Sequence, residues 1–142
     1  MVGNTDNNRF GSDIDALFSQ HGISSTQQRR QIARILLSKP QHLSADQILE
    51  RVNQENAIAS KATIYNTLGL FARKGLIREV IIDPSKVFYD SNTNDHHHIY
   101  HVDTGMLVDV HPQELALQNH PTTPDGTELE RVDIIVRVRS KG

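Results

Sequence analysis

The sequence contains no cysteine and no tryptophan, and aromatic residues make up only 5% of it. The lack of cysteine excludes disulfides, thiolate catalysis, and zinc or iron–sulfur sites built from cysteine. Any metal that this chain binds must therefore be held by nitrogen and oxygen atoms. No apolar run approaches the ~20 residues that cross a bilayer, and the polar start lacks the apolar core of a signal peptide. We therefore expect a cytoplasmic protein with no membrane partner.

The net charge of −2 conceals two parts of opposite sign. Residues 24–78 contain nine Arg and Lys against three Asp and Glu, a net charge of +6. The rest of the chain contains six basic and fourteen acidic residues, a net charge of −8. A basic segment of this size favours a nucleic-acid partner, because positive charge attracts the phosphate backbone.

The basic part shows the pattern of helices followed by a hairpin. Apolar spacing predicts helices at residues 12–20, 25–38, 44–52 and 60–74, with Ser44 and Gln47 forming a capping box. From residue 76 the apolar pattern changes to that of strands, at residues 76–82 and 87–90, around a turn containing Pro84. This composition is typical of a winged helix, in which the last helix enters the DNA major groove.

The second part is predicted to hold short strands at residues 96–102, 106–110 and 132–138, with a brief helix at 112–117. Residues 119–126 include Pro121 and Pro124 and are predicted to be a loop. The expected fold class is α+β. Residues 1–90 would form a winged-helix DNA-binding domain with residues 1–11 mobile, 91–95 a hinge, and 96–142 a small α/β metal-sensing and dimerisation domain. Neither domain can bury a large core, so we expect association through a shared surface.

The last helix of the basic part carries the candidate DNA-reading residues. If its apolar positions face inward, the residues left to face outward near its start are Lys61, Thr63, Tyr65, Asn66 and Thr67. Lysine suits phosphate, while threonine, tyrosine and asparagine can contact base edges. Arg29 and Arg30 are candidate clamps on the DNA backbone. The alternative is an ordinary solvated helix face, and the segregated charge favours DNA over that alternative.

Three consecutive histidines are the strongest candidate for a sensing site. On a strand His96 and His98 share one face, whereas His97 shares the other with Asp95. Carboxylates from Asp90 and Asp109 and the imidazole of His42 could complete a site that bridges the two domains. Imidazole and carboxylate ligands suit Fe(II), Mn(II) or Zn(II) and do not choose among them. An isolated histidine is most often structural or merely exposed, and we assign no other role to His21, His111 and His120.

Several motifs, taken in order and spacing, resemble the ferric uptake regulator (Fur) family over nearly the whole chain. They are Thr26-Gln27-Gln28-Arg29-Arg30, His42-Leu43-Ser44-Ala45, Ala62-Thr63-Ile64-Tyr65 and Asp95-His96-His97-His98. Within the family, the details are most similar to the iron response regulator (Irr) subgroup. The residues that carry this are Thr63-Ile64-Tyr65-Asn66-Thr67-Leu68, Phe88-Tyr89-Asp90 and the ending from Val132 to Arg139.

The resemblance implies a repressor of iron-related genes that binds palindromic double-stranded DNA as a homodimer, with metal or haem as effector. It implies that Tyr65 contacts bases and Arg29 contacts DNA. It also implies that the regulatory metal ligands are His42, Asp90, His96, His98 and Asp109.

The sequence departs from the family's pattern where most members bind a structural zinc. His101 and Thr104 stand where most members have the first cysteine pair of a structural zinc, so we expect that zinc to be absent. Asp95 and His97 are the visible remainder of a second metal site, or a candidate haem site.

Two other classes of function remain as alternatives. A metal or haem carrier without DNA binding would use the same histidines, but it would not need the charge separation. A metal-dependent hydrolase would need an open coordination position, which five candidate ligands leave little room for. We therefore expect a regulator rather than an enzyme.

Overall fold

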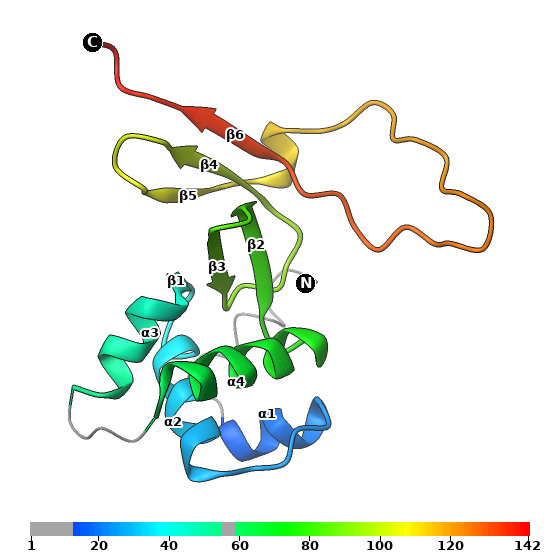
Figure 1. Cartoon of the computed structure of the whole chain (residues 1–142). Coiled ribbons are helices and arrows are strands. Elements are labelled where there is room, and N and C mark those ends of the chain that lie inside the picture. The colour runs from blue at the N-terminus through cyan, green and yellow to red at the C-terminus, as the bar shows by residue number, and fades with distance from the viewer. Residues whose placement is uncertain (1–12, 55–58) are drawn as a thin grey trace. The chain divides into compact units, whose positions relative to one another are not determined.

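The computed structural model describes residues 13–54 and 59–142, which divide into two compact units between Asn94 and Asp95 (Figure 1). The first unit contains four helices and a three-stranded sheet, and the second contains another three-stranded sheet. The predicted α+β class is confirmed. The predicted mobility of residues 1–11 lies outside the described residues.

The four helices of the N-terminal unit begin at side-chain caps that the sequence supplies. They are α1 (Ile14–Gln20), α2 (Gln27–Leu36), α3 (Ala45–Val52) and α4 (Lys61–Arg73), and their N-caps are Asp13, Thr26, Ser44 and Ser60. The predicted capping box is confirmed, since the Gln47 side chain and the Ser44 side chain each bond to the other residue's backbone N–H. Each cap satisfies a backbone donor that the first helical turn leaves unpaired.

One apolar core holds this unit together. Phe18 of α1 and Phe71 of α4 lie with their ring centroids 5.5 Å apart, and Ile32, Leu36 and Ile48 are fully buried around them. The expected inward positions Ile64, Leu68 and Phe71 of α4 are all buried. Thr67, which we expected to face outward, is only 7% exposed, so that assignment is wrong. It lies next to Leu68 at the edge of the apolar stripe, and its methyl group makes burial tolerable.

The sheet of this unit joins a short strand to the predicted hairpin. Its strands are β1 (His42–Ser44), β2 (Arg78–Asp83) and β3 (Lys86–Asp90), in the order β1-β3-β2. Three residues are too few to show the alternation of a strand, so β1 could not be predicted from the sequence. The antiparallel pairing of β1 with β3 places His42 directly opposite Asp90.

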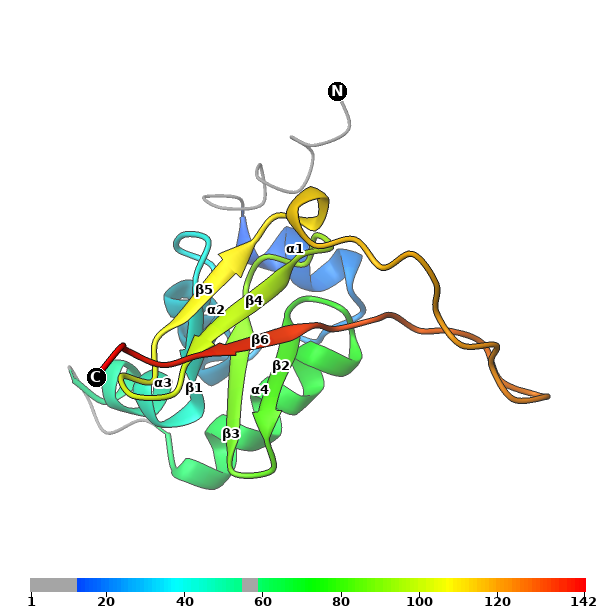
Figure 2. The same cartoon turned by 90° about the horizontal axis from the view of Figure 1, so that it is seen from above.

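The C-terminal unit is a sheet of β4 (His97–His101), β5 (Leu107–Val110) and β6 (Ile135–Val138), in the order β5-β4-β6 (Figures 1 and 2). β4 and β5 form a hairpin through a turn in which Gly105 has a φ of +74°. β6 pairs parallel with β4. The helix expected at residues 112–117 is only a 3₁₀ turn, η3 (Pro112–Glu114).

Among the residues described, none of the helices combines the length and the apolar character needed to cross a membrane.

Candidate metal centre and nucleic-acid interface

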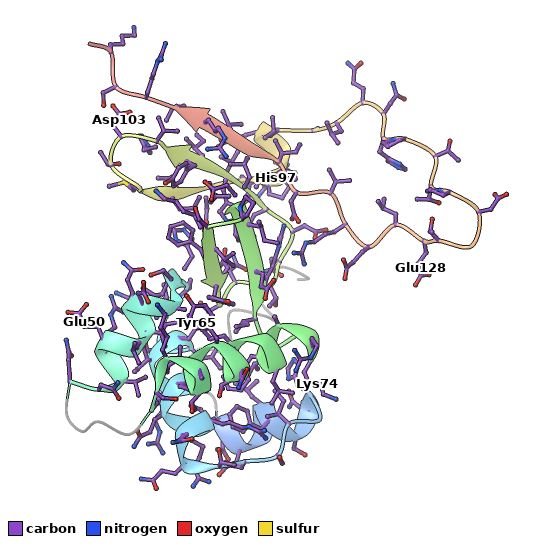
Figure 3. All side chains as sticks on the ribbon, in the orientation of Figure 1. Glu50, Tyr65, Lys74, His97, Asp103 and Glu128 are labelled. Carbon is purple, nitrogen blue, oxygen red and sulfur yellow. The ribbon has the colours of Figure 1, made fainter. Side chains whose placement is uncertain are left out.

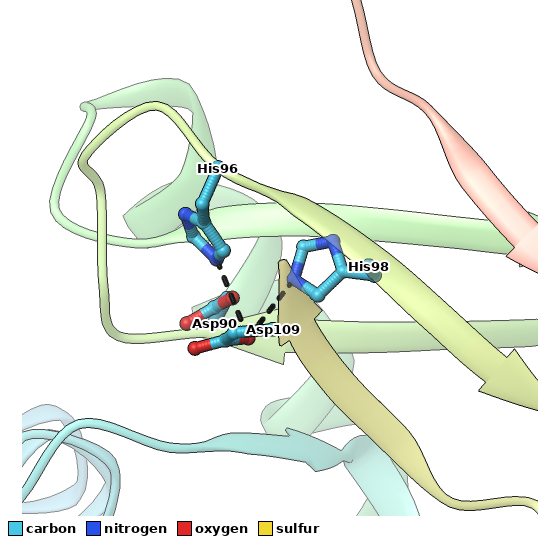
Figure 4. A group of neighbouring side chains, drawn as sticks. All are labelled: Asp90, His96, His98 and Asp109. Carbon is cyan, nitrogen blue, oxygen red and sulfur yellow. Dashed lines mark ion pairs between the residues drawn. The ribbon is translucent and has the colours of Figure 1, made fainter. Parts of the chain in front are cut away.

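Three of the predicted ligands converge in the C-terminal unit (Figure 4). His98 of β4 lies opposite Asp109 of β5, and His96 lies just before β4 with its ring centroid 4.6 Å from that of His98. The Nε2 atoms of His96 and His98 lie 3.6 Å and 3.4 Å from the same oxygen, Oδ1 of Asp109. Both histidines are buried, whereas the Asp109 side chain is 48% exposed. The alternation of strand side chains therefore produces the predicted pair of histidines.

The spacing of these three donor atoms fits a shared metal ion. Two ligands that each lie about 2.1 Å from an ion at the tetrahedral angle are about 3.4 Å apart. The two Nε2–Oδ1 separations are close to this value and longer than an ordinary hydrogen bond of about 2.7–3.2 Å. Two imidazoles and a carboxylate suit iron, manganese or zinc. These residues can hold such an ion without any sulfur ligand.

The N-terminal unit brings together the two remaining predicted ligands. Asp90 at the end of β3 is 1% exposed and lies opposite half-buried His42 in the sheet. The carboxylate of Asp90 accepts a hydrogen bond from the Asn92 backbone N–H (2.9 Å), and the His42 ring contacts the edge of Phe88 (6.2 Å between centroids). Contacts within the N-terminal unit therefore orient both the Asp90 carboxylate and the His42 ring.

His97 faces away from the His96 and His98 pair, as the alternation predicted. Its Nδ1 accepts a hydrogen bond from the Ile134 backbone N–H (3.2 Å) and so ties β4 to the entry of β6. In the neutral ring Nε2 then carries the proton, so binding a metal there requires loss of that strand contact. Asp95 is exposed. The second metal or haem site at Asp95 and His97 stays a prediction.

The three histidines to which we assigned no metal-binding role all lie close to backbone hydrogen-bonding groups, and the Nδ1 of His120 is 3.3 Å from the Pro121 carbonyl. The Nδ1 of His21 lies 2.8 Å from the Leu17 carbonyl at the end of α1. His111 caps the 3₁₀ turn η3, because its Nδ1 accepts a hydrogen bond from the Gln113 N–H (3.1 Å).

The exposed face of α4 begins with the predicted DNA-reading residues (Figure 3). Lys61, Tyr65 and Asn66 are exposed, and the Lys61 ammonium lies 5.9 Å from the centre of the Tyr65 ring. Lys61 also lies 3.7 Å from Asp46 across two solvated side chains, a pair that contributes little energy. Thr63 is half-buried, and its hydroxyl lies 3.0 Å from that of the N-cap Ser60. The start of α4 thus presents an aromatic ring and a cation together.

The two predicted backbone clamps lie at the start of α2 and bond to the segment before it. Arg29 donates to the backbone and the hydroxyl of Ser24 (2.8 and 2.7 Å). Arg30 donates to Ser25 and lies 3.6 Å from Asp15. A guanidinium has five N–H donors, so these local bonds leave donors for a phosphate. Arg78, one of the nine basic residues of the segment 24–78, is only 7% exposed and adds little positive charge to the surface.

Tyr89 of β3 interacts electrostatically with Glu79 of β2 and with Tyr65 of α4. Burial raises the pKa of the Tyr89 hydroxyl of β3 to about 12, and the negative charges of Glu79 and Tyr65 add to the shift. Glu79 is the cross-strand partner of Tyr89 in β2. Because an unfolded tyrosine titrates near pH 10, the folded state holds this proton more tightly. The resulting stability is present below about pH 10 and is lost as the pH rises toward 12.

We therefore expect Tyr89 to ionise about two pH units later than an unfolded tyrosine. Absorbance at 295 nm measures this directly, since the chain has three tyrosines and no tryptophan. Tyr89→Phe should remove a component whose midpoint lies near pH 12, and Glu79→Gln should shift that component to lower pH. If the component that Tyr89→Phe removes has its midpoint near pH 10, the hydroxyl is not shielded as described.

A basic helix face on one unit and a cluster of imidazoles and a carboxylate on the other define a metal-responsive regulator. The model of the ferric uptake regulator family matches residues 20–137. The chain belongs to the ferric uptake regulator family.

Individual relatives agree with the family assignment. The chain is 36% identical over 110 residues to the peroxide-responsive repressor PerR of Staphylococcus epidermidis, covering 75% of this chain and 73% of the relative. It is 35% identical over 116 residues to PerR of Staphylococcus aureus, covering 79% and 78%. The iron-containing structure of the ferric uptake regulator of Francisella tularensis matches with a TM-score of 0.70 and 26% identity, covering 84% of this chain and 93% of that one.

Proposed function

We propose that this protein is a transcriptional repressor whose bound effector sets the orientation of two DNA-reading units in a homodimer. The observation that carries the proposal is the convergence of His96, His98 and Asp109 on one point in the C-terminal unit. Two buried imidazoles and a carboxylate that meet at one point are a donor set that suits a divalent cation.

We further propose that Asp90 and His42 of the N-terminal unit complete this metal site. Only five residues separate Asp90 from His96, so the chain keeps their α-carbons within about 22 Å of one another. His42 is kept near His96 in the same way, because it lies opposite Asp90 in one sheet. An ion that takes ligands from both units would bind well in only one relative orientation. Its binding energy would then favour that orientation over the others.

In a homodimer this orientation determines whether the two α4 helices fit DNA. Half-sites read by paired helices lie about 34–36 Å apart, one turn of the double helix. A metal that fixes each reading unit against the dimerising unit therefore fixes the spacing of the two α4 helices. Tyr65 and Asn66 would contact base edges, while Lys61, Arg29 and Arg30 would contact phosphates.

The resemblance of several motifs to the iron response regulator subgroup favours iron or haem as the effector. The staphylococcal relatives are named as peroxide-responsive repressors, which favours a second candidate, a response to peroxide. The two differ in a measurable way. Peroxide readily oxidises Fe(II) and not Mn(II). When peroxide is added, a peroxide sensor loaded with Fe(II) should therefore leave DNA, and one loaded with Mn(II) should stay bound. A haem sensor should respond to haem whichever ion is present.

The test is a selection of bound duplexes from a random DNA pool, followed by fluorescence anisotropy with the selected duplex. The protein is assayed alone and with Fe(II), Mn(II), Zn(II) or haem, over a range of salt concentrations. We expect palindromic duplexes, an affinity that falls steeply with salt, and at least a tenfold change with one effector. Effector binding without sequence-selective DNA binding under any condition would indicate a metal or haem carrier instead.

A further inference from the structure

One face of the C-terminal sheet carries a row of half-buried or exposed apolar side chains, between His97 and His101 of β4. Strand pairing places Val108, Ile99 and Val136 in a row across β5, β4 and β6. Val108 is 39% exposed and Val136 37%, while Met106, just before β5 on the same face, is 58% exposed. On the opposite face His98, Tyr100 and Leu107 are buried, whereas the Asp109 side chain is 48% exposed. We call the row Ile99, Val108 and Val136, with Met106, the apolar face.

A long extended segment leaves the same unit between η3 and β6. Residues 115–133, which we call the arm, contain no helix or strand and project away from the sheet in both views (Figures 1 and 2). A turn at its tip, where the Thr127 N–H donates to the Pro124 carbonyl (3.1 Å), folds the arm into two legs. Leu117 and Leu129, one on each leg, are 53% and 49% exposed. Structureless segments of this length are uncommon in compact domains and are usually either functional or linkers.

We propose that the arm of one chain lies on the apolar face of a second copy and that the two copies exchange arms. This inference rests on the homodimer of the proposed function and identifies the surfaces that form it. Leu117 and Leu129 would cover Val108 and Val136 of the second copy, and the symmetric contact would form at the same time. Exposed apolar side chains on both surfaces gain by leaving water together.

Charges at the two ends of the C-terminal unit indicate that a second copy of the chain covers the apolar face. The arm carries the acids Asp125, Glu128, Glu130 and Asp133 against one base, Arg131. The chain after β6 begins carries three bases, Arg137, Arg139 and Lys141, and no acid. The structure places the arm and the C-terminus at opposite ends of the sheet (Figures 1 and 2).

The basic end is fixed in place by a backbone contact. Asp103 in the turn between β4 and β5 accepts a hydrogen bond from the Ser140 N–H (2.9 Å), and Asp103 and Glu128 lie at opposite ends of the unit (Figure 3). Within one chain the acidic and basic ends therefore point apart. In a two-fold dimer each acidic arm would meet the basic end of the other copy, as a self-complementary interface requires.

The arm is also long enough for this contact. The first leg, residues 115–123, can span about 30 Å when extended. The sheet that it must cross has three strands, about 10 Å from first to last, and strands of about 17 Å or less. An arm can therefore reach across the whole apolar face of a neighbouring copy.

The absence of cysteine makes a direct test possible. A nitroxide is attached to Leu129→Cys in unlabelled protein, which is mixed with ¹⁵N-labelled protein of the natural sequence. Broadening of the labelled amides can then come only from contact between chains. We expect the amide signals of Val108, Ile99 and Val136 to fall below about half of their intensity with a diamagnetic label at the same position. Light scattering on the same sample reports the oligomeric state.

A second sample separates exchange from folding back. Here ¹⁵N-labelled, spin-labelled Leu129→Cys protein is diluted into a tenfold excess of unlabelled natural protein. Strong broadening in this sample and none in the first would mean that the arm covers its own sheet, and would overturn the inference. A dimer with no broadening in either sample would mean another occupant, residues 1–12 for example, and would also overturn it. A monomer at all concentrations would refute the homodimer of the proposed function itself.

Charge exchange gives an independent test. Glu128→Lys with Glu130→Lys should raise the dimer dissociation constant about tenfold or more at low salt. Adding Arg139→Glu and Lys141→Glu to the same chain should restore most of the affinity, because each arm meets the other copy's basic end. Gln118→Ser, an exposed neutral change on the arm, is the matched control and should have little effect. Failure of the second pair to restore affinity would contradict the pairing.

Discussion

Replacing both His96 and His98 with alanine should abolish the effect of metal on DNA binding. The two rings supply two of the three donor atoms of the cluster, the third being Oδ1 of Asp109, and the rings are the buried ones. Loss of even an outer contact to a metal ligand commonly costs 10–100-fold in affinity, so loss of two ligands should cost more than about 100-fold. Anisotropy with the selected duplex, with and without metal, measures the effect.

Thermal unfolding provides a second readout of the same change. At a free metal concentration of 100 times Kd the natural protein should gain about 2.7 kcal/mol of stability, whereas the double variant should gain almost none. His120→Ala is the matched control, because His120 is an exposed histidine of the same unit and should leave both responses unchanged. A double variant that still responds to metal like the natural protein would place the sensing site elsewhere.

Tyr65→Ala and Lys61→Gln should weaken DNA binding in two distinguishable ways. Tyr65 is the exposed aromatic side chain of α4, and losing a base contact should cost about 1–3 kcal/mol, roughly 5–150-fold, for the selected duplex. Its effect on an unrelated duplex should be small. Lys61→Gln should weaken binding to both duplexes and lower the slope of log affinity against log salt by about 0.9.

Tyr65→Phe is the control for the first of these changes. It keeps the ring and removes the hydroxyl, so it tells stacking or methyl contact apart from hydrogen bonding. Equal losses for selected and unrelated duplexes on Tyr65→Ala would mean that α4 does not read the sequence. An unchanged salt slope on Lys61→Gln would show that this lysine makes no phosphate contact.

Local sequence patterns predicted the helices of the N-terminal unit well. Their apolar spacing and their caps are set within a few residues, as at Ser44 and Gln47, so a single segment contains the information. The misplacement of Thr67 has the same origin. The apolar spacing of a helix identifies its buried face only to within about one residue. Whether a residue at the boundary of that face is buried depends on the side chains that pack against it.

The pairing of strands was harder to predict. β1 has three residues, and its partner β3 lies more than forty residues later, so no local pattern indicates that His42 faces Asp90. The parallel pairing of β6 with β4 is equally non-local, and it is what gives His97 its bond to the Ile134 backbone. The helix predicted after β5, at residues 112–117, is only the 3₁₀ turn η3, Pro112–Glu114.

The sequence by itself excluded thiolate ligands, because the chain has no cysteine, and it pointed to imidazole and carboxylate groups. It also determined that His96 and His98 point the same way, because side chains alternate along an extended chain. Only the tertiary structure decided which carboxylate faces them. Asp109 meets both rings through the register of β4 with β5, which long-range hydrogen bonding fixes. The apolar face likewise appears only once three separated strands lie side by side.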